Sequence, residues 1–338
     1  MAPETRPLLP RANPRPDRRL ALRKGAWAED GVAKTPQCIA HRGYKAKLPE
    51  NTMAAFRAAA AAGAHAIETD LHLSRDGVVV LSHDGDLKRC FGVDKRVNEC
   101  DWSYLRTLRT IKAPHEPMPS LEELLAFLAE CEQEDMWLIL DIKMHDDAED
   151  LVSKTAETIA LAPKPTRPWH ERVVLGCWNK SYLSLAIAHL PTHPRCLINV
   201  STLYAASLLG PRNSDLSFSL GYFVLAGPLG ALFRAAAASA GHPVFAWTVN
   251  SRAWMEWAIH AGLEGVVTDE VEAYLEVATG PERAGQKGGR VVRGIVGVWT
   301  AAWLSAVHLI VVLVVAVYLL LGGGGVTRRN RRPLPAKL

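Results

Sequence analysis

The chain has 338 residues, of which 49% are hydrophobic and 22% charged, so it can bury a large core and is too apolar to be disordered throughout. The formal net charge of +4 is unevenly distributed: residues 1–36 carry eight Lys or Arg against four acids, residues 281–338 carry nine against one, and the middle is acidic. Basic ends on an acidic body argue against a nucleic-acid partner and favour an anionic membrane surface.

Residues 1–36 combine prolines with scattered arginines and show no hydrophobic periodicity, so we expect them to be disordered. A mitochondrial transit peptide is the alternative, which the prolines weaken because they would break its helix. No apolar stretch there resembles a secretory signal, and the six cysteines of the chain show no C-x-x-C pair or zinc spacing. We therefore expect reduced thiols in a cytosolic environment.

Residues 37–278 alternate short apolar runs with helical segments. About 240 residues of β-then-α units predict an α/β fold, the (β/α)8 TIM barrel. A doubly wound open sheet is the alternative, but no glycine-rich nucleotide loop follows the first strand. Asn51 or Thr52 is expected to cap the first helix, and Ser120 with Glu123 forms a capping box. The predicted strands span residues 38–41, 66–71, 78–82, 138–142, 173–177, 196–200, 217–222, 244–249 and 265–268, and predicted helices between them include 52–62, 120–131, 146–160 and 251–261.

Polar residues cluster where the predicted strands end, which is where a barrel of this kind carries its chemistry. His41 and Arg42 close the first strand. Glu68 and Asp70 in the second strand share one face, because side chains alternate with period 2. Two inward carboxylates repel each other and are costly to bury without a cation. We expect this strand to end before His72, which is therefore left out of the site. Further polar residues at strand ends are His83, Asp84, Asp141, Lys143, Trp247, Asn250, Thr268 and Asp269.

Eight short motifs follow one another along the chain: H-R-G, P-E-N-T, E-T-D, D-G-V-V-V-L-S-H-D, M-P-S-L-E-E-L, L-D-I-K, W-T-V-N and V-V-T-D. In order and spacing they resemble the glycerophosphodiester phosphodiesterase family over residues 37–275. The wording H-R-G-Y-K-A-K-L-P-E-N-T of residues 41–52, together with the basic, apolar C-terminal tail, looks most like the fungal phosphatidylglycerol-specific phospholipase C branch. The resemblance implies a TIM barrel that hydrolyses a phosphodiester.

The resemblance also implies one divalent cation, held by Glu68, Asp70 and Asp141. The third ligand of the family is usually Glu, and we interpret Asp141 as a variant of an active site. Oxygen-only ligands suit Mg²⁺ or Ca²⁺ rather than zinc. With such an ion, the three carboxylates and the cations of Arg42 and Lys143 leave a single positive charge, which one phosphodiester monoanion neutralises. We therefore assign Arg42 and Lys143 to the substrate phosphate.

His41 and His83 suit proton transfer, one taking a proton from the attacking oxygen and the other giving one to the leaving alkoxide, in either order. The alternative for both is a structural histidine satisfied in the core or a turn. Trp247 is assigned to the wall of the pocket. Glu50 and Asn51 are assigned structural roles in the first loop and at the start of the following helix.

The C-terminal region divides into a basic linker (279–293), an uncharged segment (294–327) and a basic tail (328–338). As a helix, Ile295–Leu321 would be roughly 40 Å long, enough to cross a hydrocarbon core of about 30 Å. A buried helix of the soluble domain is the alternative, but the segment is apolar all round and flanked by arginines. We therefore expect a membrane anchor, which either crosses fully or enters as a hairpin near Gly322–Gly325.

Together these features predict a membrane-anchored, metal-dependent phosphodiesterase that hydrolyses phosphatidylglycerol to diacylglycerol and glycerol 3-phosphate. A glycerophosphodiester phosphodiesterase or lysophospholipase D is the alternative enzyme, and an inactive membrane-tethered barrel is the alternative without activity. We expect a phospholipid substrate, and an intracellular membrane (endoplasmic reticulum, lipid droplet or mitochondrial outer membrane) with the catalytic domain in the cytosol.

Overall fold

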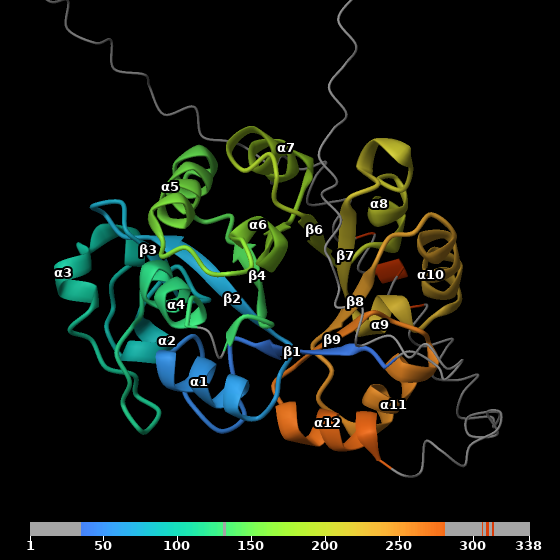
Figure 1. The fold of residues 1–338 in the computed structure, drawn as a ribbon, viewed down its shortest axis with the longest axis horizontal. Coiled ribbons are helices and arrows are strands. Elements are labelled where there is room, and N and C mark those ends of the chain that lie inside the picture. The colour runs from blue at the N-terminus through green and yellow to red at the C-terminus, as the bar shows by residue number, and fades with distance from the viewer. Residues whose placement is uncertain (1–34, 131–132, 281–305, 307–308, 311–312, 314–338) are drawn as a thin grey trace, which may run out of the picture.

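The structure is a computed structural model, and it describes residues 35–130 and 133–280 together with the isolated residues 306, 309, 310 and 313. Its centre is a closed barrel of eight parallel strands with helices around it (Figure 1). Because β1 pairs with both β2 and β9, the eight parallel strands form a closed ring, which confirms the predicted barrel over the open sheet. Around the barrel, the strands are β1 (Gln37–His41), β2 (Ala66–Leu73), β4 (Trp137–Ile142), β5 (Val173–Cys177), β6 (Arg195–Asn199), β7 (Leu216–Gly221), β8 (Val244–Trp247) and β9 (Gly265–Thr268).

The ninth predicted strand lies outside the barrel. It is β3 (Val79–Leu81), which runs antiparallel to the far end of β2. This pairing joins His72 to Val80 and Leu73 to Val79, so β2 continues to Leu73. The prediction that this strand ends before His72 was therefore wrong, and His72 is fully buried.

The helices pack on the outside of the barrel and follow the strands in chain order. Thr52, rather than Asn51, caps α1, since its side chain accepts a hydrogen bond from the backbone N–H of Ala55 at 3.2 Å. The capping box of Ser120 and Glu123 is confirmed at the start of α4. The helices outside residues 82–120 are α1 (Met53–Ala61), α4 (Leu121–Leu128), α5 (Ala148–Leu161), α6 (Trp169–Arg172), α7 (Lys180–His189), α8 (Thr202–Ala206), η4 (Pro211–Asn213), α9 (Tyr222–Leu225), α10 (Pro228–Ser239), α11 (Arg252–His260) and α12 (Val271–Thr279).

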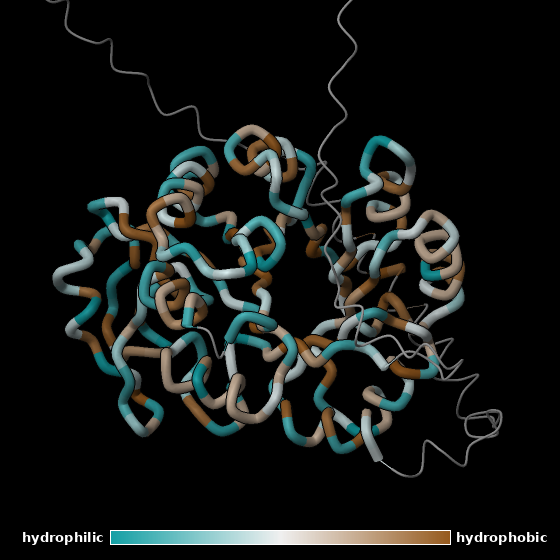
Figure 2. The backbone as a smooth tube through the Cα atoms, in the orientation of Figure 1, coloured by the Kyte–Doolittle hydropathy of each residue, from teal (hydrophilic) through white to brown (hydrophobic). Residues whose placement is uncertain are grey.

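Two apolar clusters hold the barrel together. The larger joins the strands to the surrounding helices. Figure 2 shows hydrophobic residues along the strands and, on the helices, alternating with hydrophilic ones. The smaller cluster includes Ile39, Ala66, Ile139 and Val267, which lie two residues apart from the polar residues at the strand ends and so share their inward face. Apolar side chains therefore fill the lower barrel, beneath the charged end.

Residues 82–120, between β3 and α4, form an insertion at the carboxyl end of β2. It contains α2 (Lys88–Phe91), the 3₁₀ helix η2 (Val97–Glu99) and α3 (Trp102–Leu105). It has a small apolar core of its own with Val80 of β3; the other members are Leu87, Val97, Cys100, Leu105 and Met118.

The predicted N-terminal region, basic linker, apolar anchor and basic tail lie almost entirely outside the described residues, so those predictions stay predictions. Among the residues that the structure describes, no helix has the length and apolar character needed to cross a membrane.

Candidate active site

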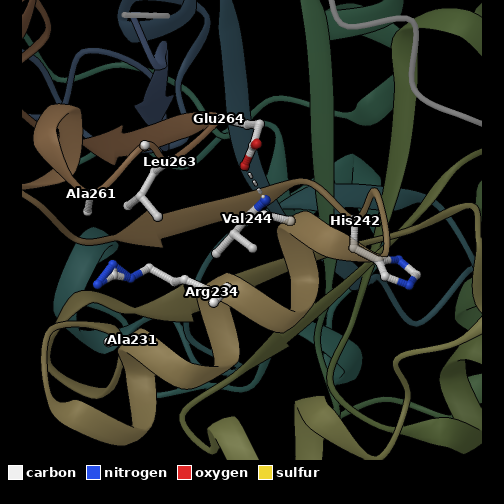
Figure 3. A pocket seen from close by; sticks show the side chains of 10 residues that line it. Ala231, Arg234, His242, Val244, Ala261, Leu263 and Glu264 are labelled. Atoms are coloured by element: carbon white, nitrogen blue, oxygen red, sulfur yellow. Dashed lines mark hydrogen bonds between the residues drawn. The ribbon is translucent and has the colours of Figure 1, made fainter.

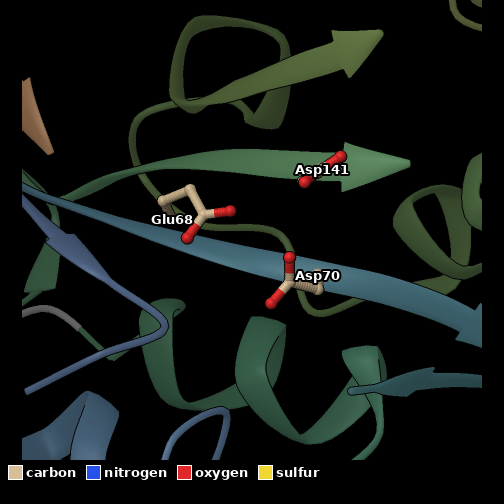
Figure 4. A group of neighbouring side chains, drawn as sticks. All are labelled: Glu68, Asp70 and Asp141. Atoms are coloured by element: carbon tan, nitrogen blue, oxygen red, sulfur yellow. The ribbon is translucent and has the colours of Figure 1, made fainter. Parts of the chain in front are cut away.

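Three carboxylates converge inside the carboxyl end of the barrel. Glu68 and Asp70 extend from β2 and Asp141 from the neighbouring β4, and the three point toward one another (Figure 4). One oxygen of each lies within 4.8 Å of the others. The parallel register pairs Asp70 directly with Asp141, which brings the two acids to the same level. Their exposed fractions are only 6%, 1% and 4%, so the predicted cluster exists and is buried.

Two cations lie directly against these acids. Lys143, just beyond β4, places Nζ 2.6 Å from Asp70 Oδ1 and 2.5 Å from Asp141 Oδ2. Arg42 Nε lies 3.2 Å from Asp70 Oδ2. Burial alone would raise the pKa of Asp70, but Lys143 and Arg42 outweigh it and lower that pKa. Burial raises the pKa of Glu68 well above its usual range, and the charges of Asp70 and Asp141 raise it further.

The donor set fits a divalent cation. Carboxylate oxygens are the ligands that Mg²⁺ and Ca²⁺ prefer, and three carboxylates are gathered in this buried site. At Glu68 the negative charge of the other two acids is not fully balanced by the neighbouring Arg42 and Lys143, since the pKa of Glu68 is raised. A bound cation would relieve the repulsion that raises the pKa of Glu68. Glu68, Asp70 and Asp141 would therefore hold the metal.

His41, the last residue of β1, points into the same site. Its Nε2 lies 4.0 Å from Glu68 Oε2, and its Nδ1 lies 2.7 Å from Asp269 Oδ1. Because a carboxylate only accepts, the Nδ1–H donates to Asp269, and in the neutral ring Nε2 is left with a lone pair. Burial lowers the pKa of His41, partly opposed by Asp269. Asp269 is itself held by the side-chain amide of Asn250 at 2.8 Å.

His83 lies in the loop after β3, at the start of the insertion. Its Nδ1 lies 2.7 Å from Asp84 Oδ1, so it has the same kind of carboxylate partner as His41. The His83 side chain is 35% exposed, which makes it the more accessible of the two histidines. Burial still lowers its pKa, although the nearby carboxylate of Asp70 opposes this effect.

The structure connects the remaining predicted residue, Trp247, to the site through a second tryptophan. Trp178 donates from Nε1 to Asp141 Oδ1 at 2.7 Å, and its ring meets that of Trp247 edge-on with centroids 6.2 Å apart. Trp247 donates its own Nε1–H to the carbonyl of Ser219 at 2.9 Å. The two indoles thus lie side by side next to Asp141, and the role of Trp247 as a pocket wall stays a prediction.

Sequence reasoning missed several residues that hold the site. Asn51 was assigned a structural role, but its side-chain amide donates to Asp70 Oδ2 at 2.8 Å and its oxygen accepts from the hydroxyl of Thr69. Asp269 was seen at a strand end without a role, although its place in the V-V-T-D motif was the available signal. Trp178 carried no signal, because nothing in the sequence relates it to Asp141.

Two cavities, each of about 270 Å³, lie at the opposite end of the barrel. One lies between α10 and the turn before β9, where Arg234, His242 and Glu264 line it (Figure 3). The other lies below β1 and β4. Neither is lined by any predicted site residue, and the candidate active site is therefore the place where the acids, cations and histidines converge.

The fold agrees with comparisons to known proteins. The model of the glycerophosphoryl diester phosphodiesterase family matches residues 41–273. The "Probable glycerophosphodiester phosphodiesterase 2" of Mycobacterium tuberculosis is 28% identical over 251 residues, which cover 71% of this chain and 89% of that protein. A glycerophosphodiester phosphodiesterase of Caldanaerobacter subterraneus is 28% identical over 249 residues, covering 71% and 96%. The structure of an Oleispira antarctica phosphodiesterase in complex with the product sn-glycerol-3-phosphate shares the fold, with a TM-score of 0.61, 22% identity and coverage of 72% and 96%.

Proposed function

The chain belongs to the glycerophosphoryl diester phosphodiesterase family and is a phosphoric diester hydrolase, and on this premise we propose that it cleaves phosphatidylglycerol to diacylglycerol and glycerol 3-phosphate. The observation that carries the catalytic part is the convergence of three buried carboxylates with Arg42 and Lys143 at one end of the barrel.

The choice of lipid rests on two features of the sequence. The amino-acid sequence of residues 41–52 resembles that of the fungal phosphatidylglycerol-specific phospholipase C branch, and residues 294–327 are uncharged and largely apolar. The second feature supports an anchor that keeps the barrel at a membrane whose lipids are its substrate. We propose that this is an intracellular membrane and that the barrel faces the cytosol.

Glu68, Asp70 and Asp141 would hold one divalent cation, either Mg²⁺ or Ca²⁺. When bound, such an ion supplies Lewis-acid stabilisation of charge on phosphoryl oxygens. Arg42 and Lys143 bring fixed positive charge to the same place, and burial strengthens their effect on a phosphodiester anion.

The two histidines are proposed to move the protons. One ring accepts the proton of the hydroxyl that attacks phosphorus, and the other donates a proton to the departing oxygen. Asp269 holds His41 and Asp84 holds His83, and each carboxylate fixes the tautomer in which Nε2 is the reactive nitrogen.

The resemblance implies that the attacking hydroxyl belongs to the substrate and lies vicinal to the phosphate, which gives the large advantage of an intramolecular nucleophile. In phosphatidylglycerol only the headgroup glycerol has a free hydroxyl there, because the matching lipid position is acylated. Attack therefore expels diacylglycerol and forms a cyclic glycerol phosphate, which water opens to glycerol 3-phosphate.

The test offers purified full-length protein phosphatidylglycerol, its analogue lacking the middle headgroup hydroxyl, and phosphatidylcholine. We expect diacylglycerol from the first only, loss of activity in EDTA, and recovery on adding Mg²⁺ or Ca²⁺. Equal cleavage of the analogue, or comparable cleavage of phosphatidylcholine, would overturn the proposal.

A further inference from the structure

Arg89, in α2 of the insertion, contacts two carboxylates at once. Its Nη1 and Nη2 donate to the two oxygens of Glu50 at 2.9 and 2.7 Å, and its Nε donates to Asp84 Oδ2 at 2.5 Å. The other oxygen of Asp84 accepts from His83 Nδ1 at 2.7 Å. Glu50 also accepts from Arg42 Nη1 at 2.9 Å. One guanidinium thus links the loop that carries Arg42 to the loop that carries His83.

Packing alone does little to fix this part of the site. The side chains of His83, Asp84 and Arg89 are 35%, 27% and 48% exposed, in contrast to His41 at 12%. Helix α2 has only four residues, and Leu87, the residue that precedes it, gives no side-chain cap. The orientation of the His83 ring therefore depends on its hydrogen bonds rather than on a close-packed surround.

A guanidinium suits this task better than any other side chain. Its planar fork can bind one carboxylate with two parallel N–H groups while the third position reaches another acid. Here Glu50, only 10% exposed, is the fixed end, and Asp84 is the end that meets His83. Arg89 also places a positive charge directly against Asp84.

We propose that Arg89 is a positioning residue for catalysis, which fixes the ring of His83 by holding Asp84 against it and anchors this arrangement to the first loop through Glu50. The inference rests on the proposed role of His83 in proton transfer. The inference assigns the insertion a role in catalysis, because its helix α2 carries the residue that orients His83.

The chain offers a matched control in Arg75, which lies before the insertion and forms a bidentate pair with Asp101 at 2.9 and 2.5 Å. Both side chains of this pair are exposed, at 62% and 37%, and their hydrogen bonds join them to each other rather than to a site residue. Arg75→Ala therefore removes an equivalent forked pair that ties the insertion down without touching His83.

The experiment measures kcat and KM of the full-length protein on phosphatidylglycerol for Arg89→Ala, Arg89→Lys, Arg75→Ala and His83→Ala. We expect Arg89→Ala to lower kcat roughly 10- to 100-fold, as removal of a residue that orients a functional histidine does, with KM within about threefold. Arg89→Lys should fall between, because an ammonium cannot hold both acids. Free guanidinium ion should restore part of kcat to Arg89→Ala and none to His83→Ala.

A kcat for Arg89→Ala equal to that of Arg75→Ala overturns the inference, and so does a loss that guanidinium does not relieve. If Arg89→Ala fails to fold, Arg89→Lys decides: reduced kcat at an unchanged Tm supports the inference, and wild-type kcat overturns it. Failure of the proposed function is distinct, since the wild type would then release no diacylglycerol or His83→Ala would be fully active.

Discussion

At the scale of single residues, the inward side chains change from apolar to charged along β2 and β4. On β2 the inward column runs Ala66, Glu68, Asp70, and on β4 Ile139 is followed by Asp141. The apolar layer excludes water beneath the acids, so each charge depends on its immediate partners. Asp70 has cations beside it, while Glu68 has mainly other acids, and this difference leads to a testable contrast.

Glu68→Gln and Asp70→Asn should both abolish turnover, because each removes charge from the metal-binding cluster. Their effects on the free energy of unfolding in EDTA should differ. Glu68 has a raised pKa, so its ionised form opposes folding at neutral pH and the amide should leave stability unchanged or higher. Asp70 has a lowered pKa, and its loss strands Lys143 and Arg42, which should cost on the order of 3 kcal/mol.

Urea unfolding curves and turnover assays on the same preparations check this contrast. Near-normal turnover in either variant would refute the metal assignment.

Asp141→Glu should retain more activity than Asp141→Ala, because it keeps a carboxylate in the position.

Asp269→Asn should lower kcat on the order of 10²-fold or more, because an amide no longer enforces the tautomer in which His41 Nδ1 donates. His41→Ala should lower kcat at least as much. In the His41→Ala background, Asp269→Asn should have little further effect, since it acts through the ring. Independent, multiplying losses measured in the double variant would show that Asp269 has a separate role.

Glu50 should contribute stability that depends on pH. Burial alone would raise its pKa, but hydrogen bonds and charges of Arg89 and Arg42 lower it to about 2. A carboxyl with a lowered pKa stabilises the fold above its unfolded pKa, and this contribution is lost as pH falls toward the folded value. The stability difference between wild type and Glu50→Gln should thus be on the order of 3 kcal/mol at about pH 7 and shrink below about pH 4.5. Urea unfolding across this range checks it, and a difference independent of pH would contradict it.

At the scale of elements, the β1–α1 loop aims Arg42 by an unusual backbone course. Arg42 and Gly43 are both left-handed, with φ of 57° and 79°. A Cβ at Gly43 would lie 2.8 Å from the backbone of Ala55 in α1. Gly43→Ala should therefore move the β1–α1 loop away from α1 and lower both the free energy of unfolding and the turnover rate.

Gly241→Ala is the matched control, because Gly241 has a similar φ of 73° and a Cβ there would meet nothing within 4 Å. Gly241→Ala should lower the free energy of unfolding by about 1 kcal/mol, the strain of a left-handed alanine, and leave kcat unchanged. Thermal unfolding and kcat of the two variants make the comparison, and equal destabilisation would rule out the close approach to α1.

The elements also show how far the sequence alone could lead. Period-2 alternation correctly placed Glu68 and Asp70 on one inward face, since that pattern is local. The same reasoning ended β2 too early, because His72 is polar and only its pairing with β3 and its contact with Asp146 at 2.6 Å explain its burial. Contacts of this kind depend on tertiary structure, and so does the link from Trp178 to Asp141.

At the scale of the whole molecule, the site depends on closure of the barrel. The pairing of β1 with β9 brings His41 beside Asp269, which lies 228 positions further along the chain. Pairing of β2 with β4 brings Asp70 level with Asp141 and so aligns the carboxylates of the proposed metal site. The groups of the candidate site thus come from the first and the last strands of one closed barrel, and the barrel is complete by residue 268.

This completeness predicts that catalysis and membrane attachment can be separated. Deleting residues 290–338 removes the proposed anchor but no strand of the barrel, and α12 already ends at Thr279. The truncated protein should hydrolyse short-chain or micellar phosphatidylglycerol with kcat within about twofold of the full chain, since every group of the site remains. On bilayers it should lose most of its activity, because nothing then holds the mouth of the barrel at the lipid surface. Assays on both substrates, with sedimentation of vesicles, check this prediction. If the truncated protein still pelleted fully with membranes, residues 290–338 would not be the main anchor, and if it lost activity on micelles as well, the tail would have a part in the site itself.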